Sequence, residues 1–298
     1  MSPRFTLAIV LTSIFVVLLA GCATPAPPTS TPSPAPPKAL RVQVAVSEVV
    51  LGPNRLLLAL TDTEGRPVAN ATANIRLFRP GVQDAAPAAE ADAMYLGNDQ
   101  GVALALYSAR ATFDQAGEWR LEAVVTEAQG VSRSASATLQ VQERGLAPRI
   151  GDPIPASQNQ TVRDTPIEQL TSQRPPGDVA FYDLAVAEAL EQRKPLMVVI
   201  STPAFCQTRT CGPQLEAAQA LQTRYKDRLN FIHVEVFQRP DLLLEGSIQP
   251  QVNPVLFEWK LQTEPWVFLA GADGKVFERF EGFSTEAELE EAVQRLLD

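Results

Sequence analysis

The chain has 298 residues, of which 25 are Lys or Arg and 34 are Asp or Glu, so its formal charge is −9. The length predicts one or two domains, and the 45% apolar content is ordinary for a globular protein. The acidic balance argues against a nucleic-acid-binding protein and supplies no basic patch for anionic lipids. The single histidine excludes a metal site built from several histidines.

The N-terminus carries an export signal. Arg4 precedes an uninterrupted apolar run over residues 5–20, which ends in "LAGC" with Cys22 as its last residue. A run this short, followed by small residues, favours a signal peptide over a membrane-spanning helix, and an uncleaved N-terminal anchor is the alternative. Both alternatives place the rest of the chain on the extracytoplasmic face of the cell membrane.

The same four residues resemble the lipobox of bacterial lipoproteins. The resemblance implies a signal peptide over residues 1–21, cleavage before Cys22, and lipid such as palmitate on the Cys22 sulfur. Two or more acyl chains would anchor the protein stably in the lipid bilayer, because a single chain binds only marginally. Residues 22–38, rich in Pro, Ser, Thr and Ala, cannot bury a core and predict a semi-rigid tether.

Residues 39–144 have apolar side chains at every second position. In "GEWRLEAVV", for example, Trp119, Leu121, Ala123 and Val125 alternate with polar residues. About seven such short strands with turn signals between them predict an antiparallel β-sandwich. The stretches "DTEGRPVANATANIRL" and "FDQAGEWRLEAVV" resemble bacterial immunoglobulin-like domains. That resemblance implies a fold and no ligand, so a spacer or protein-contact module is expected.

After a connector over residues 145–178, the pattern of residues 179–298 changes to alternating helices and strands. Helices are expected over residues 180–194 and 213–227, with Pro213 at the first helical position of the second. Buried strands are expected over 195–201 and 229–237. Asn253 is expected to cap a short helix, and a hairpin should follow around "GADG".

The chain closes with "TEAELEEAVQRLL", which predicts a helix. Thr285 and Glu288 match a capping box, and Leu289, Val293 and Leu296 give the apolar stripe. The carboxylates at positions 286, 288, 290 and 291 are expected to form a solvated face.

Two cysteines, Cys206 and Cys211, lie between the first strand and the next helix. If Cys22 carries lipid, each is the other's only intramolecular thiol partner, and an exported compartment permits a disulfide. Residues five apart on a regular helix lie on different faces, so "CQTRTC" must be a loop with Cys211 near the helix start. A redox pair, a metal site and a structural bridge are the three open interpretations.

The element order and the position of the cysteines resemble the thioredoxin fold over residues 179–298. "KPLMVVISTPAFC" looks like the strand that delivers the active-site cysteine, and "TEPWVFLAGADGKV" looks like the stretch whose cis proline, here Pro265, faces the cysteines. The resemblance implies thiol–disulfide exchange with exported proteins and a redox partner, with Cys206 attacking and Cys211 resolving. The expected fold class is therefore an all-β immunoglobulin-like sandwich followed by an α/β thioredoxin-like domain.

This chain also departs from the thioredoxin pattern. Four residues separate the cysteines where thioredoxins have two, Phe205 replaces a tryptophan, and the strand over 195–201 has no carboxylate. The wider spacing is similar to that of Sco-type copper chaperones, which implies Cu(I) on Cys206 and Cys211 as an alternative. Those proteins add a distant histidine, whereas His233 here lies inside an expected strand and is interpreted as a core or sheet-surface residue. No other cofactor is predicted, and catalytic turnover and non-catalytic binding both stay open.

Overall fold

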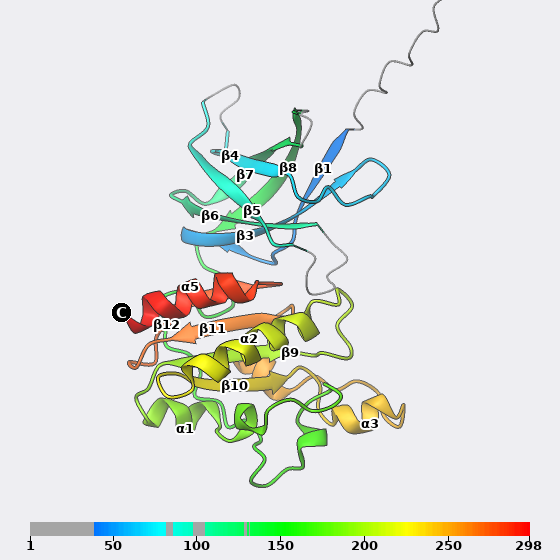
Figure 1. Ribbon diagram of the computed structural model, residues 1–298. Helices are drawn as coiled ribbons and strands as arrows, with labels where there is room; N and C mark the ends of the chain where they lie inside the picture. The colour runs from blue at the N-terminus through cyan, green and yellow to red at the C-terminus, as the bar shows by residue number, and fades with distance from the viewer. Residues whose placement is uncertain (1–38, 82–85, 98–104, 128–129, 131) are drawn as a thin grey trace, which may run out of the picture. The chain divides into compact units, whose positions relative to one another are not determined.

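The computed structural model describes residues 39–81, 86–97, 105–127, 130 and 132–298 (Figure 1). The predicted signal peptide, lipidation site and tether lie outside these residues and stay predictions. All described residues belong to one compact unit. The domain boundaries expected inside it also stay predictions, so residues 39–144 are called the β-rich part and residues 145–298 the α/β part. In this described portion of the chain, every helix is too short or too polar to cross a bilayer.

The β-rich part forms an eight-stranded sheet with the order β1-β3-β6-β5-β4-β7-β8-β2. Its strands are β1 (Leu40–Val44), β2 (Val49–Val50), β3 (Gly52–Asp62), β4 (Thr72–Phe78), β5 (Ala89–Tyr95), β6 (Leu106–Phe113), β7 (Gly117–Thr126) and β8 (Ser132–Gln142). All neighbours are antiparallel except β2 and β8. The predicted alternation is present in β7, where every second side chain is buried.

Strand β5 joins the two halves of this sheet. Residues Ala89–Ala93 pair with β4, whereas Met94 and Tyr95 pair with β6. At the other side of the β-rich part, β1 lies beside β8. The two halves enclose one apolar core, in which Phe113 meets Trp119 edge to face with ring centroids 5.0 Å apart. An antiparallel two-layer arrangement matches the predicted class of structure, while the immunoglobulin-like type stays a prediction.

The α/β part is built on a four-stranded sheet with the order β10-β9-β11-β12. The strands are β9 (Leu196–Ser201), β10 (Asn230–Glu235), β11 (Trp266–Ala270) and β12 (Val276–Glu281). Strands β9 and β10 are parallel, and β11 is antiparallel to both β9 and β12. The parallel pair needs a crossover, and α2 (Cys211–Tyr225) supplies it. The predicted buried strands and the hairpin after Pro265 are confirmed.

Helices cover both faces of this sheet, and β9 is therefore buried along its whole length. One apolar cluster joins the sheet to α2 and α5 (Glu286–Leu297). The other joins the opposite face to α1 (Val186–Glu191) and α4 (Pro254–Glu258). The α/β part also contains three further short elements, which are η1 (Ile167–Gln169), η2 (Val179–Tyr182) and α3 (Pro240–Leu244). The predicted Asn253 cap is confirmed, since its side chain accepts a hydrogen bond from the Val255 N–H.

The continuous helix expected over residues 180–194 is wrong. The chain forms η2, leaves helical geometry at Ala185, and restarts as α1. Phe181 and Tyr182 are buried in the cluster on one face of the sheet, whereas Val186 and Ala189 are buried on the other. One straight helix cannot pack on both faces, so tertiary packing overrides the local pattern.

The solvated carboxylate face expected for the last helix is wrong at Glu288. The Thr285 hydroxyl accepts the Glu288 N–H as predicted, but the Glu288 carboxylate does not return to the cap. It is buried and takes a two-point hydrogen bond from the Arg55 guanidinium, at 2.7 and 2.8 Å, and another from Ser108. The other three carboxylates are more exposed and pair with Arg224 or Arg295.

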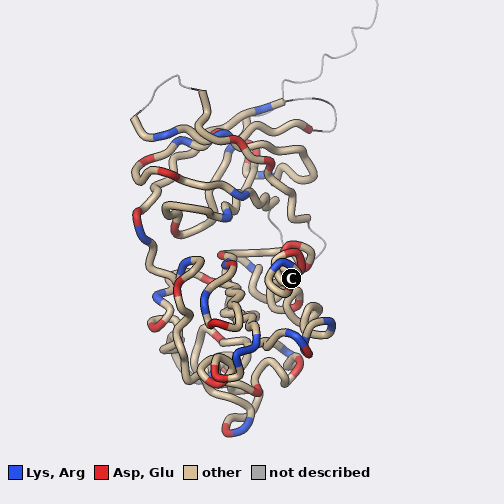
Figure 2. The backbone as a smooth tube through the Cα atoms, turned by 90° about the vertical axis from the view of Figure 1, so that its left-hand side faces the viewer, with Lys and Arg blue, Asp and Glu red and all other residues tan. Residues whose placement is uncertain are grey.

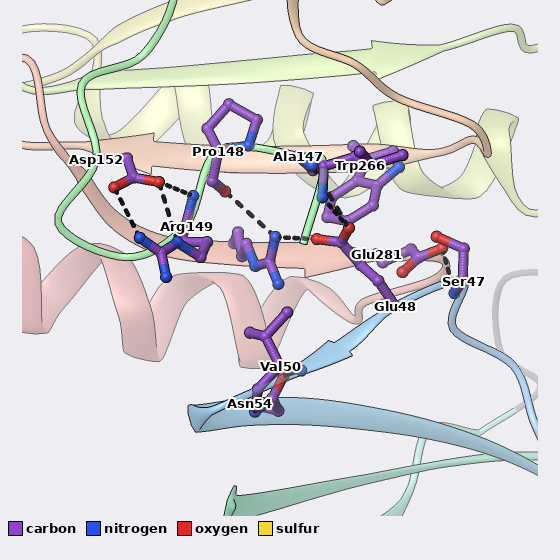
Figure 3. Close-up of polar contacts among 12 residues, drawn as sticks. Ser47, Glu48, Val50, Asn54, Ala147, Pro148, Arg149, Asp152, Trp266 and Glu281 are labelled. Carbon is purple, nitrogen blue, oxygen red and sulfur yellow. Dashed lines mark hydrogen bonds and ion pairs between the residues drawn. The ribbon is translucent and has the colours of Figure 1, made fainter. Parts of the chain in front are cut away.

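Arg55 and its neighbours connect the β-rich part to the α/β part. The Arg55 guanidinium also donates to the backbone oxygens of Glu281 and Phe283. Near it, Arg279 pairs with Glu48. The Ser47 N–H donates to the Glu281 carboxylate, as Figure 3 shows. Elsewhere Lys and Arg positions are interspersed with Asp and Glu positions along the described chain (Figure 2). The buried arginine therefore joins β3 to the start of α5 with four hydrogen bonds.

Replacing Arg55 by Met should lower the free energy of unfolding by about 3–5 kcal/mol, because it leaves the buried Glu288 carboxylate without its partner. Arg224→Met is the matched control: its pairs with Glu286 and Glu290 are exposed, and it should cost no more than about 1 kcal/mol. Urea unfolding of both variants measures the difference. Equal losses would contradict the role given to the buried pair.

Candidate active site

The end of strand β9 leads into the turn that carries Cys206. The Thr202 carbonyl accepts the N–H groups of Phe205 and Cys206, and the Cys206 carbonyl accepts the N–H of Arg209. Arg209 has a φ of 59°, a left-handed conformation that turns the chain toward α2. Helix α2 begins at Cys211, two residues before Pro213. The predicted loop between the cysteines is confirmed. Pro213, expected at the first helical position, is the third residue of α2, still within the first turn, where its missing N–H costs no hydrogen bond.

The Cys206 sulfur lies over the N-terminus of α2. It is half-buried, 3.1 Å from the Thr208 hydroxyl and 3.9 Å from the Thr210 hydroxyl, and those two hydroxyls are 2.8 Å apart. The backbone N–H groups of Thr210 and Cys211 also point to this sulfur. Thr210 occupies the cap position of α2, yet its side chain makes no capping hydrogen bond. The Cys206 sulfur thus serves as the acceptor that a capping side chain normally provides.

These contacts lower the pKa of Cys206 to about 5, well below the ordinary value of about 8.5. The largest cause is the hydrogen bond from the Cys211 thiol. Burial acts in the opposite direction, and the Thr208 hydroxyl and the two backbone N–H groups then add to the lowering. Cys206 is therefore a thiolate at neutral pH, which is the nucleophilic form of cysteine.

Cys211 has the opposite properties. Its side chain is fully buried. Its pKa is raised, first because its thiol proton is held in the hydrogen bond to Cys206 and second because burial disfavours the charge. Both cysteines are free thiols in this structure. The pair thus combines a reachable thiolate with a protonated thiol beneath it, which is the asymmetry that thiol–disulfide exchange uses.

Pro265 lies beside the turn that carries the cysteines. Trp266 pairs with Ile200 in the register of β11 and β9, so the residues just before β11 meet the residues just after β9. The Glu264–Pro265 peptide bond is cis, and Pro265 is buried. Burial raises the pKa of Glu264, and the charge of Cys206 raises it further. The structure brings Cys206, Cys211 and Pro265 together, while their catalytic roles stay predictions.

A buried carboxylate lies near the site on β10. The neighbouring strand β9, where thioredoxins often have one, carries none. Glu235 ends β10 opposite Ser201, and burial raises its pKa to about 7. It accepts the Ser172 N–H at 2.7 Å, and the Ser172 hydroxyl in turn accepts the Ala204 N–H at 3.0 Å. Glu235 therefore helps to hold the turn of residues 202–206 in place through Ser172.

His233 is a core residue, as predicted. Its Nδ1 atom is 2.8 Å from the Tyr182 hydroxyl and its Nε2 atom is 2.9 Å from the Ser201 hydroxyl. Complete burial lowers its pKa to about 4, so the ring is neutral at physiological pH. With both ring nitrogens engaged by side chains, His233 has no free atom with which to bind a metal.

The cysteine pair fits Cu(I) poorly. Binding Cu(I) through both sulfurs would require Cys211 to give up the proton that it donates to Cys206. Within the described ranges, no cluster of three His, Cys, Asp or Glu side chains could complete such a site. The arrangement instead suits chemistry in which one sulfur is charged and the other keeps its proton.

Sequence reasoning missed four contributors to the site. Thr208 and Thr210 lie inside the quoted motif, and their spacing lets both hydroxyls face one sulfur once the segment is a loop. Glu264 immediately precedes Pro265, and Glu235 is a charged residue within an apolar run. A carboxylate in an apolar run indicates a buried group with a specific partner, because carboxylates are seldom fully buried without one.

No protein-family model matches the chain. No curated protein matches it either. Solved structures that resemble parts of it include a thioredoxin family protein and a domain described as a thiol–disulfide oxidoreductase, each matching little more than a third of the chain.

One is a thiol:disulfide interchange protein of the thioredoxin family from Chlorobium tepidum TLS, at 16% identity and a TM-score of 0.31, covering 38% of this chain and 85% of that one. StoA from Bacillus subtilis matches at 18% identity and a TM-score of 0.27, covering 34% and 82%. CopC from Methylosinus trichosporium OB3b matches at 10% identity and a TM-score of 0.24, covering 36% and 96%.

The pH dependence of Cys206 alkylation tests the environment of its sulfur. In the chain carrying Cys22→Ser, the iodoacetamide rate should reach half its maximum near pH 5, because the reactive form is the thiolate. Cys211→Ala should move that midpoint upward toward about 8.5, since it removes the main hydrogen bond to the sulfur. Thr208→Val should move it upward by less. A wild-type midpoint near 8.5 would contradict the described contacts.

Proposed function

We propose that the chain is a thiol–disulfide exchange protein whose working pair is Cys206 and Cys211. The observation that carries this proposal is the half-buried Cys206 sulfur at the N-terminus of α2, with the Cys211 thiol buried beneath it. A purely structural bridge would need neither a stabilised thiolate nor access to solvent. A loop of this size would also stabilise the fold little, by about 2 kcal/mol.

The direction of exchange favoured by this geometry is oxidation of the substrate. The structure stabilises the reduced pair, because the Cys206 thiolate accepts hydrogen bonds that a neutral disulfide cannot accept as well. Stabilising the reduced form makes a disulfide a stronger oxidant, and a thiol of low pKa also leaves faster. Both effects favour transfer of the disulfide from this chain to a substrate.

The reaction is then a two-step exchange. A substrate thiolate attacks the Cys206 sulfur of the oxidised pair, the Cys206–Cys211 bond breaks, and Cys211 takes a proton as it leaves. A second substrate thiolate attacks the first substrate sulfur, which forms the substrate disulfide and releases Cys206 as a thiolate. The substrate loses two electrons and the pair gains them. A redox partner that carries a disulfide restores the oxidised pair by the same exchange.

The proposed location is the extracytoplasmic face of the cell membrane. Its support is the apolar run over residues 5–20 and the "LAGC" motif that ends at Cys22. Lipid on Cys22 would hold the protein at the bilayer through the tether. The substrates would accordingly be the thiols of exported proteins in a compartment that permits disulfides.

Equilibration with glutathione tests the redox proposal. The Cys206–Cys211 pair should have a reduction potential between about −200 and −120 mV, more oxidising than the value of about −270 mV for thioredoxin. Cys206→Ser and Cys211→Ser should each abolish oxidation of a reduced dithiol peptide. A potential below about −300 mV without exchange would mark a structural bridge. Stoichiometric Cu(I) binding that is lost in both variants, again without exchange, would favour a copper carrier.

Metabolic labelling with palmitate tests the anchor. Expressed in a bacterium, the full chain should incorporate label and lose residues 1–21. Cys22→Ala should abolish labelling, because the acyl acceptor is the Cys22 sulfur. Cys206→Ala and Cys211→Ala are matched controls and should be labelled normally. An unlabelled chain that keeps its N-terminus would instead support an uncleaved anchor.

A further inference from the structure

A cavity of about 330 Å³ lies beside the cysteine loop. One wall comes from the cysteine side and includes Thr208, Thr210 and Glu264. The opposite wall comes from the β-rich part and includes Val44, Ala45 and Val46. This cavity, called the lateral groove, is contiguous with the redox site, because Thr208 and Thr210 are the residues whose hydroxyls contact the Cys206 sulfur.

The base of the lateral groove is a small apolar cluster shared by the two parts. Leu57 and Leu106 of the β-rich part pack with Phe283 of the α/β part, and Ala45 and Val46 pack against this cluster. The contact is close at the neighbouring Gly282, where a Cβ atom would come within 2.6 Å of the Leu57 side chain. A larger residue there would have to displace the end of the Leu57 side chain and adopt the left-handed φ of 71°, so glycine is favoured and the backbone of the α/β part lies close to the apolar wall.

The polar atoms around the lateral groove select against an acidic occupant. Glu264 and Glu281 line it, and no lysine or arginine does so among the described residues. The Glu281 carboxylate is already engaged by the Ser47 N–H and the Thr263 hydroxyl. What remains for an occupant is apolar surface with a negative rim, which suits a large apolar side chain and repels a carboxylate.

We infer that the lateral groove binds an apolar side chain next to the reactive cysteine of an unfolded exported protein, so that the β-rich part sets substrate preference. This inference rests on the proposed function. Cysteines and large apolar residues are both among the most buried residues of folded proteins. An unfolded chain exposes both together, and an extended segment can place its sulfur at Cys206 while a neighbouring side chain enters the groove. The β-rich part is then a component of the substrate site and more than a spacer.

Two synthetic peptides test the inference. They are identical reduced dithiol peptides, except that Leu flanks each cysteine in one and Asp in the other. The full chain carrying Cys22→Ser, oxidised beforehand, should oxidise the Leu peptide about tenfold faster or more, the scale on which an apolar pocket discriminates. Val46→Glu should abolish that preference when each peptide rate is divided by the same variant's rate with dithiothreitol, a small dithiol that does not fill the groove.

Two further variants serve as controls. Met94→Glu places the same charge on an exposed methionine of β5 that does not line the groove, and it should keep the wild-type preference. Val46→Thr keeps the side-chain shape and should reduce the preference by a smaller factor, which covers the case that Val46→Glu fails to fold.

Equal wild-type rates for the two peptides, or equal effects of Val46→Glu and Met94→Glu, would overturn the inference while the exchange function stands. A wild-type chain that oxidises no thiol, dithiothreitol included, would overturn the proposed function as well.

Discussion

The contact between the Cys206 sulfur and the N-terminus of α2 is the interaction on which the site depends. A helix begins with N–H groups that have no partner in the helix, and a side chain at the cap position usually accepts them. Here the four-residue loop returns the Cys206 sulfur to that position, while the Thr210 side chain turns to Thr208. Capping of α2 and charge on the sulfur are therefore the same interaction, so the stability of the first helical turn depends on the redox state.

The sheet provides the rest of the environment at one edge. The ends of the parallel strands β9 and β10 and the start of the antiparallel β11 meet there. This register brings the segments that carry Cys211, Glu235 and Pro265 to the same edge, although Cys211 and Pro265 are 54 positions apart in the sequence. Burial then separates the two sulfurs: the one at the end of the turn keeps access to solvent, and the one inside the helix loses it. The difference in reactivity follows from topology more than from the motif itself.

Much of the fold could be predicted because it depends on neighbours in sequence. The alternation in β7, the buried strands β9 and β10, the Asn253 cap and the loop between the cysteines are all local patterns. The errors involve partners far along the chain. Glu288 looks solvated until Arg55, 233 residues away, is placed beside it. The split of residues 180–194 likewise depends on which face of the sheet each side chain reaches, and periodicity within one segment does not contain that information.

The α/β part and the β-rich part have separate roles in the proposed site, because stabilising a thiolate and selecting a side chain need different surfaces. The thiolate must be stabilised by a few short contacts, which leaves little room at the sulfur for selecting a substrate. Selectivity for an apolar side chain needs a preformed surface of some area, and helix α2 and its loop are too small to supply it. The β-rich part has that surface, and the buried Arg55–Glu288 pair, with the close approach at Gly282, fixes it against the α/β part. A preformed wall needs little ordering when a substrate binds, so a larger share of each apolar contact made there contributes to discrimination.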